Sequence, residues 1–135
     1  FEESELFMNR IKLEFKERSY GLYAVELKES NEFIGFTGFH FTDIDTDFSP
    51  CVEISWRYVP KAWGYGYATE AAKACIEYAK RELGFNEIYS FTYILNRRSE
   101  NVMKKLGMKR VGNFQHPLVP DEHKLKEHVL YKLEL

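Results

Sequence analysis

Residues 58–80 read YVPKAWGYGYATEAAKACIEYAK and change character halfway along. An aromatic, strand-like segment stops at Pro60, and an alanine-rich helix begins near Ala68. Gly64 and Gly66 lie between the two, where glycine allows left-handed backbone angles and a close approach to a ligand. The N-terminus of a helix carries unpaired main-chain N–H groups and a partial positive charge, which together favour bound phosphate. The stretch therefore predicts a strand, a phosphate-binding turn and a helix.

Hydrophobic periodicity and turn residues predict the elements on either side of this stretch. The expected elements are a helix over 3–18, strands over 20–27, 33–41, 51–59 and 88–95, a short helix capped by Ser99 and stopped by Gly107, and strands over 109–114 and 128–135. The first two strands and the last two form antiparallel pairs. The strand, helix and strand in the middle form one parallel crossover. The fold class is therefore α/β with a mixed, mostly antiparallel sheet.

Composition limits the classes of function. The 135 residues are 44% hydrophobic and 16% aromatic, which suits a single globular domain over residues 1–135. A net charge of −2, with charges of both signs, gives no reason to expect a nucleic-acid or membrane partner. No apolar run approaches the roughly 18 residues that span a bilayer, and no signal-peptide pattern opens the chain. Cys51 and Cys75 are expected to be free thiols in a cytoplasmic protein.

Two common phosphate-binding motifs do not fit the glycine turn. A Walker A loop requires Lys and Ser or Thr after its last glycine, and no lysine follows Gly66. The dinucleotide-binding pattern requires a small residue where Thr69 stands, and it requires an acidic residue at the end of a strand about twenty positions later, which the chain lacks. Taken by itself, the turn could also be a plain connection between a strand and a helix.

A third pattern fits better. The segment resembles the acetyl-CoA-binding signature of the GNAT superfamily of N-acetyltransferases, [Q/R]-x-x-G-x-[G/A], with Gly66 and Ala68 in the last two places and Trp63 where the signature has Gln or Arg. The strings EISWRYVPKAWGYGYATEA (53–71) and NRRSENVMKKLGMKRVG (96–112) resemble the RimJ/RimL-like branch, which acetylates the N-termini of ribosomal proteins. The resemblance covers about residues 20–135. It implies a GNAT-like sheet with a central, splayed pair of parallel strands flanked by helices.

The resemblance also implies where coenzyme A binds. Main-chain groups near Tyr58 and Val59 are expected to bond the pantetheine arm, and Asn96 is expected to bind the cofactor. The amides of Gly64, Tyr65, Gly66, Tyr67, Ala68 and Thr69 are expected to hold the pyrophosphate. Relatives open with a strand and a helix before the helix over 3–18, so this chain is expected to lack those elements and with them part of the acceptor wall.

Three side chains are candidates for the chemistry. Glu53 is the candidate general base, although it could instead be a solvated carboxylate or the ion-pair partner of Arg57. Ser99 matches the family's proton donor to the departing thiolate, and it could also be the helix N-cap. Lys104 is the candidate phosphate ligand from the basic run over 97–110, whose alternative is a solvated basic helix.

The acceptor is expected to be a primary amine. Deprotonating an α-amine at pH 7 costs about 1.4 kcal/mol and deprotonating a lysine about 4.6 kcal/mol, which favours a protein N-terminus or a small-molecule amine. The loop over 115–123 is a candidate for lining the acceptor cleft. His116, His123 and His128 match no metal-ligand spacing, so no metal is expected. The alternatives are a non-catalytic acyl-CoA sensor and a nucleotide-binding domain, and an exposed last strand together with the many aromatic residues of the chain would suit a homodimer.

Overall fold

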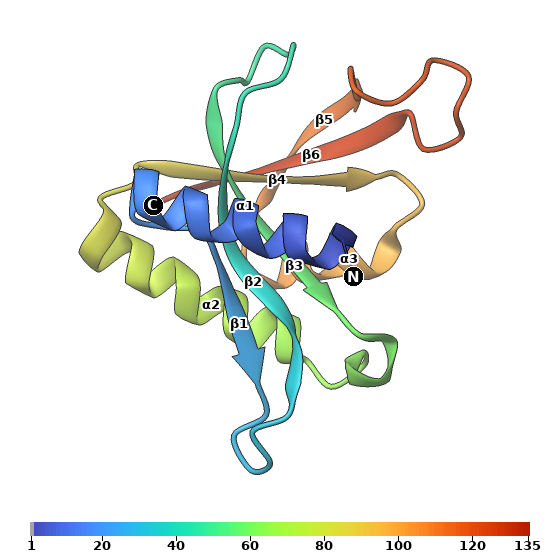
Figure 1. Cartoon of the computed structure of the whole chain (residues 1–135). Coiled ribbons are helices and arrows are strands. Elements are labelled where there is room, and N and C mark those ends of the chain that lie inside the picture. Colours follow the sequence, from blue (N-terminus) through green and yellow to red (C-terminus); the bar gives the residue numbers. More distant parts are fainter. Residues whose placement is uncertain (1) are drawn as a thin grey trace.

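The computed structural model describes residues 2–135, with side chains from residue 5 onward. Its helices and strands, in chain order, are α1 (Glu2–Arg18), β1 (Leu22–Glu26), β2 (Phe33–Thr42), β3 (Cys51–Tyr58), α2 (Tyr67–Tyr78), β4 (Glu87–Tyr93), α3 (Arg97–Lys105), β5 (Lys109–Gln115) and β6 (Glu127–Glu134) (Figure 1). The strands form one sheet in the order β1-β2-β3-β4-β6-β5. Every neighbouring pair is antiparallel except β3 and β4, which are parallel. The expected mixed α/β fold is confirmed.

Helices cover both faces of the sheet. Helix α1 crosses one face over β2 and β3 (Figure 1), where the ring of Phe7 meets that of Phe36 at 5.5 Å. Helix α2 packs on the opposite face through small buried residues such as Ala72, and α3 adds Met103 to the same core. The alternation along β3 separates the two environments, because successive side chains of a strand point to opposite faces. Ile54 therefore belongs to the core, and Glu53 faces α1.

The parallel strands β3 and β4 meet at one point and then separate. Within the described chain, Glu53 and Tyr89 are their only register pair. Beyond Glu53 the last residues of β3 pair with β2 alone, up to Tyr58 opposite Gly35. The strand edge that faces β4 is thus left without a strand partner, as the expected splay requires.

The turn between β3 and α2 explains both of its glycines. A short 3₁₀ turn over Pro60–Ala62 follows β3. Gly64 and Gly66 then adopt φ angles of +87° and +82°, and Gly66 is the N-cap of α2. Residues with a Cβ atom pay a steric penalty in this left-handed region, so glycine is the preferred residue there. Helix α2 begins one residue before its expected start, and its extension over Ala79–Leu83 ends at Gly84 with φ +66°, as expected for a C-terminal glycine.

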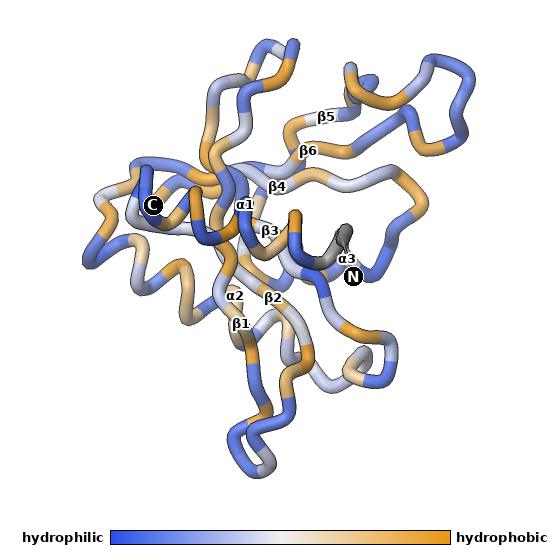
Figure 2. The backbone as a smooth tube through the Cα atoms, in the orientation of Figure 1, coloured by the Kyte–Doolittle hydropathy of each residue, from blue (hydrophilic) through white to orange (hydrophobic). Residues whose placement is uncertain are grey.

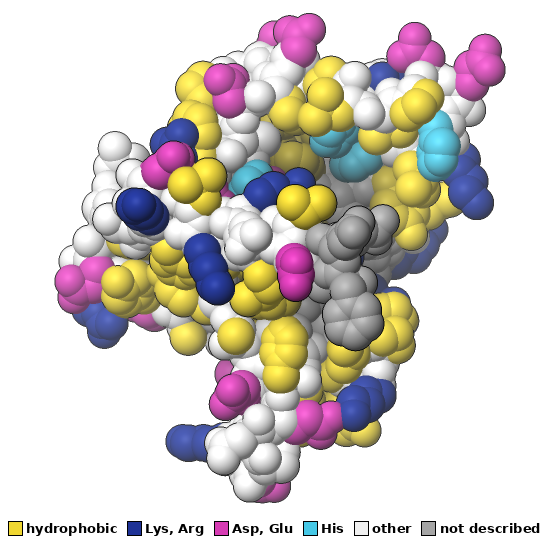
Figure 3. Space-filling view, viewed as in Figure 1, with side chains coloured by type: hydrophobic (Ala, Val, Ile, Leu, Met, Phe, Trp, Pro, Cys, Tyr) yellow, Lys and Arg dark blue, Asp and Glu magenta, His cyan; other side chains and the backbone are white. Residues whose placement is uncertain are grey.

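Polar residues lie where the backbone leaves the sheet. The tube in Figure 2 is mostly hydrophilic at the tip of the β1–β2 hairpin, and along the strands it changes between hydrophobic and hydrophilic. On the face that carries α1, positive and negative side chains are interspersed (Figure 3). No helix among the described residues is long and apolar enough to cross a membrane. Cys51 and Cys75 are both free thiols, as predicted, and burial raises the pKa of each to about 11.

Candidate functional site

A cleft of about 470 Å³ opens where β3 and β4 separate. Its walls come from the end of β3, the glycine turn, the start of α2, the end of β4 and one face of α3. The lining residues are Trp56, Arg57, Tyr58, Ala62, Trp63, Gly64, Gly66, Tyr67, Ala68, Thr69, Tyr93, Asn96, Arg98, Ser99, Asn101, Val102 and Lys105. The structure therefore brings together the two sequence strings that were separated by more than twenty residues.

The glycine turn presents free main-chain donors to this cleft. Among the described residues, no N–H group from Gly64 to Thr69 donates a hydrogen bond to another protein group, and Gly66 has no side-chain cap. A Cβ atom at Gly64 or Gly66 would meet no other protein atom within 4 Å. The left-handed backbone and the open space together leave the N-terminus of α2 exposed to an anion.

The pantetheine contacts expected at Tyr58 and Val59 are only partly available. The N–H of Val59 donates to the carbonyl of Ile34 at 3.0 Å, so Val59 is bonded to β2 and does not line the cleft. Main-chain groups alternate along a strand, so those of Trp56 and Tyr58 point away from β2 toward the gap. The carbonyl of Tyr58 already accepts a 3.1 Å hydrogen bond from Nε1 of Trp63.

Two other aromatic residues of the turn differ in position. Tyr65 is 69% exposed and stacks on Tyr67 at 5.4 Å, and it is not a lining residue. Trp63, which departs from the family signature, lies on the cleft wall with the guanidinium of Arg98 over its ring, 3.9 Å from the centroid. This cation–π contact joins the glycine turn to α3 across the mouth of the cleft.

Asn96, not Ser99, caps α3. The side-chain oxygen of Asn96 accepts the N–H of Ser99 at 3.3 Å, and its amide nitrogen donates to Thr92 at 3.0 Å. Helix α3 begins at Arg97, so Ser99 lies in the first turn and the predicted cap was wrong. An asparagine is an equally good cap, and the sequence offered both residues within four positions. The hydroxyl of Ser99 instead accepts Nε1 of Trp56 at 3.3 Å inside the cleft.

The basic side chains of α3 differ in orientation. Arg98 and Lys105 line the cleft together with Asn101 and Val102, whereas Lys104 does not. Residues seven apart lie on the same side of a helix, so Arg98 and Lys105 share a face from which Lys104 is rotated by about 100°. The structure thus places the expected basic charge at the cleft but on a different lysine.

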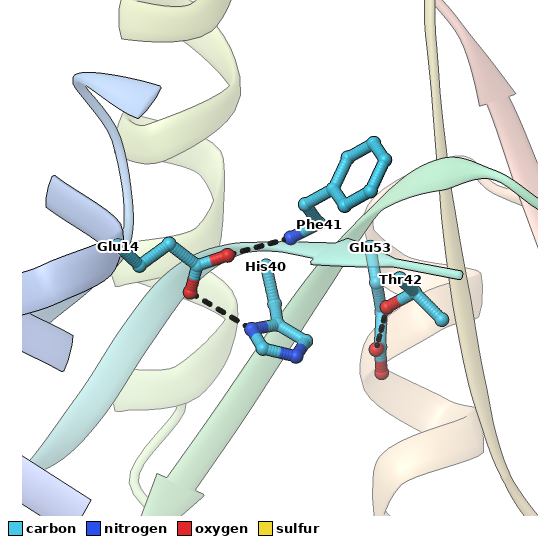
Figure 4. Close-up of polar contacts among 5 residues, drawn as sticks. All are labelled: Glu14, His40, Phe41, Thr42 and Glu53. Carbon is cyan, nitrogen blue, oxygen red and sulfur yellow. Dashed lines mark hydrogen bonds and ion pairs between the residues drawn. The ribbon is translucent and has the colours of Figure 1, made fainter. Parts of the chain in front are cut away.

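Glu53 lies at the point where β3 and β4 meet and is not a solvated carboxylate. Burial raises its pKa from 4.5 to about 7, against the opposing effects of a hydrogen bond from Thr42 and of nearby His40. The hydroxyl of Thr42 donates to Oε1 of Glu53 at 3.0 Å (Figure 4). Arg57, the alternative ion-pair partner, instead lies over the ring of Phe7 at 5.2 Å. A carboxyl group with a pKa near neutrality can both take up and release a proton at pH 7.

The match to known proteins agrees with this geometry. A family model for the acetyltransferase (GNAT) domain matches residues 2–109. The chain belongs to the GNAT acetyltransferase family. Among its relatives, the uncharacterized protein YkkB of Bacillus subtilis (strain 168) is 32% identical over 113 residues, which cover 80% of this chain and 64% of YkkB. This GNAT chain therefore spans less than two thirds of the length of that relative.

Solved structures show the same GNAT fold. A GNAT-family acetyltransferase from Bacillus anthracis is 30% identical with a TM-score of 0.69, over 84% of this chain and 65% of its own. Mycobacterium smegmatis RimJ, solved in complex with CoA-disulfide, aligns with a TM-score of 0.78 at 17% identity, over 96% of this chain and 60% of its own. At that identity the RimJ likeness concerns the fold.

The residues of this GNAT cleft fit a coenzyme A molecule. Its diphosphate needs several donors at one place, which the free amides from Gly64 to Thr69 provide. Its further phosphate needs a cation, and the side chains of Arg98 and Lys105 stand on the opposite wall. The open backbone edge of β3 can bond an extended arm as a strand would. All three features lie along one cleft.

Sequence reasoning missed several residues of the site. Trp56 was not a candidate, and no local pattern indicated its bond to Ser99. Glu14 and His40 carried no motif, yet both lie beside Glu53 (Figure 4). His40 could have been found from its position on β2, because β2 is the antiparallel neighbour of β3, the strand that carries the candidate base Glu53.

The histidines and the 115–123 loop lie away from the cleft wall. His116 and His128 pack against each other at 4.8 Å between ring centroids, beside Phe91 and Phe114. Nδ1 of His123 accepts the N–H of Leu125 within the loop at 3.0 Å. In the described part of the chain, no three His, Cys, Asp or Glu side chains are placed to hold a metal ion. The loop's role at the acceptor stays a prediction.

Proposed function

We propose that this chain is an N-acetyltransferase that moves an acetyl group from acetyl-CoA directly to a primary amine. The observation that carries the proposal is the row of free amides from Gly64 to Thr69 at a cleft that opens beyond Glu53, where β3 and β4 separate. A donor row of this kind suits the diphosphate, and the splay of β3 and β4 suits the arm that bears the thioester.

The chemistry needs two protons removed from the acceptor nitrogen and one proton supplied to the departing thiolate. Glu53 takes the first proton from the acceptor ammonium, and its pKa of about 7 suits that exchange. The neutral amine attacks the thioester carbonyl and forms the new C–N bond, its nitrogen loses the second proton to water, and the C–S bond breaks. Ser99 gives its hydroxyl proton to the departing thiolate and regains one from solvent. The bond from Trp56 uses a lone pair of Ser99 and leaves that hydroxyl hydrogen available.

The cofactor cleft meets a second groove at the place where the acceptor would react. A groove of about 640 Å³ runs between α1 and strands β2 and β3, and it shares Trp56 and Arg57 with the cofactor cleft. We infer that the acceptor enters through this groove, whose wall includes Glu14 and His40. A base with a pKa near 7 is better matched to an α-amine than to a lysine, so a protein N-terminus or a weakly basic small amine is the proposed acceptor. The motif resemblance to RimJ/RimL-like enzymes supports the same choice.

The test is release of free thiol from acetyl-CoA in the presence of a panel of amines. The panel contains peptides with free N-termini, the same peptides acetylated at the N-terminus, polyamines and free lysine. Wild-type protein is expected to release thiol with at least one free amine, and Glu53→Gln to lower kcat by at least about a hundredfold. Glu77→Gln on the exposed side of α2 is the matched control. Tight binding of acetyl-CoA without release for any amine would favour the sensor instead.

A further inference from the structure

Glu14 binds two neighbouring groups of strand β2. Its Oε1 lies 2.8 Å from Nδ1 of His40, and its Oε2 accepts the N–H of Phe41 at 2.8 Å (Figure 4). The Glu14 side chain is only 14% exposed, because it is packed between α1 and the sheet. The two bonds fix both oxygens of the carboxylate, so the His40 ring has a defined orientation.

This contact determines which nitrogen of His40 carries the proton. An ionised carboxylate can only accept hydrogen bonds, so Nδ1 of His40 must be the donor. In the neutral ring Nε2 then holds a lone pair and can accept a proton. A carboxylate on one nitrogen of a histidine also stabilises the charged ring that forms when the other nitrogen is protonated.

His40 lies directly across from Glu53. The two residues are register partners in the antiparallel β2–β3 pair, where opposite Cβ atoms are about 4.5–5.5 Å apart. In Figure 4 the His40 ring lies between the Glu14 and Glu53 carboxylates. Thr42 occupies Oε1 of Glu53, and no protein group in the described chain donates to its Oε2. The oxygen of Glu53 that would receive the substrate proton is therefore free.

The far side of His40 reaches solvent. Its side chain is 55% exposed, whereas Glu53 is partly buried at the junction of two strands. We propose that His40, oriented by Glu14, is the proton exit of Glu53 during turnover. The inference rests on the proposed function and adds a pair of positioning residues to it.

The proton balance of the relay is simple. Glu53 receives one proton from the acceptor ammonium and becomes neutral. The proton then passes through solvent to Nε2 of His40, which restores the Glu53 carboxylate and forms an imidazolium held by Glu14. The imidazolium releases the same proton to bulk water at its exposed edge. No group is oxidised or reduced, and each residue returns to its initial state.

Other charges surround the relay and bear on its pH dependence. The charged groups that line the same groove as His40 are Arg10, Glu14, Glu17 and Arg18 from α1 and Arg57 from β3. Glu53 faces His40 from β3, and His40 lowers the pKa of Glu53 while Glu14 raises it. The two relay residues thus act on Glu53 with opposite signs. These charge effects would also act if the Glu14–His40 contact were only a structural clasp between α1 and β2, so a kinetic test of proton transfer through His40 is needed to tell the two apart.

The first test concerns the ring itself and needs no turnover. Nitrogen NMR of protein labelled at histidine is expected to show His40 with a proton on Nδ1 and none on Nε2 at high pH. Glu14→Gln is expected to lose this preference, although its side-chain oxygen can still accept the N–H of Phe41. A His40 ring protonated on Nε2 in the wild-type protein would overturn the relay.

The second test separates a relay from a clasp by chemical rescue. His40→Ala is expected to lower kcat about tenfold or more with little change in the KM for acetyl-CoA. Added imidazole is expected to restore kcat in proportion to its concentration. His40→Gln is expected to move the acidic limb of the kcat/KM profile to higher pH, and Glu14→Gln to lower pH. Thermal unfolding of each variant reports any loss of the clasp separately.

The outcomes distinguish the two levels of inference. An active wild-type protein whose His40→Ala variant is not restored by imidazole would overturn the relay alone. Failure of the wild-type protein to release thiol with any amine would overturn the proposed function, and the relay with it. Restoration by imidazole together with the opposite shifts would establish the exit path.

Discussion

Nε1 of Trp56 donates a 3.3 Å hydrogen bond to the hydroxyl of Ser99, which joins strand β3 to helix α3 across the cleft. The two residues are 43 positions apart in the chain, and each comes from one of the two strings that resemble the RimJ/RimL-like branch. It orients the Ser99 oxygen into the cleft and frees the serine from the capping role, which belongs to Asn96. A serine held this way is suited to give a proton to a leaving group.

Substituting Ser99 should therefore affect chemistry more than stability. Ser99→Ala is expected to lower kcat at least about tenfold and the free energy of unfolding by only about 1 kcal/mol, the value of one lost hydrogen bond. Steady-state kinetics and urea unfolding measure the two effects. An Ala variant with the wild-type kcat would remove Ser99 from the proton-donor role.

Substituting Asn96 should instead affect stability more than chemistry. Asn96→Ala removes the N-cap of α3 and is expected to lower the free energy of unfolding by about 1 kcal/mol. Asn96→Asp keeps a capping oxygen and should retain most of that stability, but it adds a negative charge to the cleft. If Asn96 also contacts the cofactor, calorimetry will show weaker coenzyme A binding for the Asp variant. Unchanged affinity in both variants would limit Asn96 to capping.

Glu53 should make stability depend on pH in a defined window. Its pKa is raised from 4.5 in the unfolded chain to about 7, so the folded state binds its proton more tightly. That stabilisation is complete below pH 4.5 and is lost as pH rises to about 7. Glu53→Gln keeps a neutral side chain and should be more stable than wild type above pH 7, by at most about 3 kcal/mol. Unfolding curves at pH 5 and pH 8 measure the difference, and an equal difference at both would contradict the raised pKa.

Gly66 should matter to both the backbone and the ligand. Gly66→Ala places a Cβ atom on a residue with φ +82° and is expected to lower the free energy of unfolding by about 1 kcal/mol. The new methyl group points into open space beside the free amides, so coenzyme A should bind about tenfold more weakly. Gly84→Ala is the matched control, because Gly84 also has a positive φ and open surroundings but lies at the other end of the helix. Equal effects of both variants on binding would argue against the amide row.

The two adjacent lysines of α3 provide a direct comparison. Lys105 lines the cleft and Lys104 does not. Lys105→Gln is expected to weaken coenzyme A binding roughly three- to tenfold at low salt, and the loss should shrink as ionic strength rises. Lys104→Gln should change the affinity little under the same conditions. A larger effect for Lys104 would place the phosphate on another face of α3.

Local patterns in the sequence determined the elements and the glycine turn. The fold class was predictable because it depends on residues that are near one another in the chain. Such residues determine the periodicity of the helices and strands, the positive φ angles at Gly64 and Gly66, and the parallel crossover. The free amides of the glycine turn were predictable for the same reason, because the start of a helix leaves them unpaired.

Only the tertiary structure decided the details of the chemistry. Which residue caps α3, which lysine faces the cleft and how far burial raises the pKa of Glu53 depend on contacts between distant segments. Glu14 and His40 are 26 positions apart, and only the packing of α1 on β2 brings them together beside Glu53. The alternation along a strand predicts on which face of the sheet a side chain lies, whereas its neighbours on that face depend on how the elements pack.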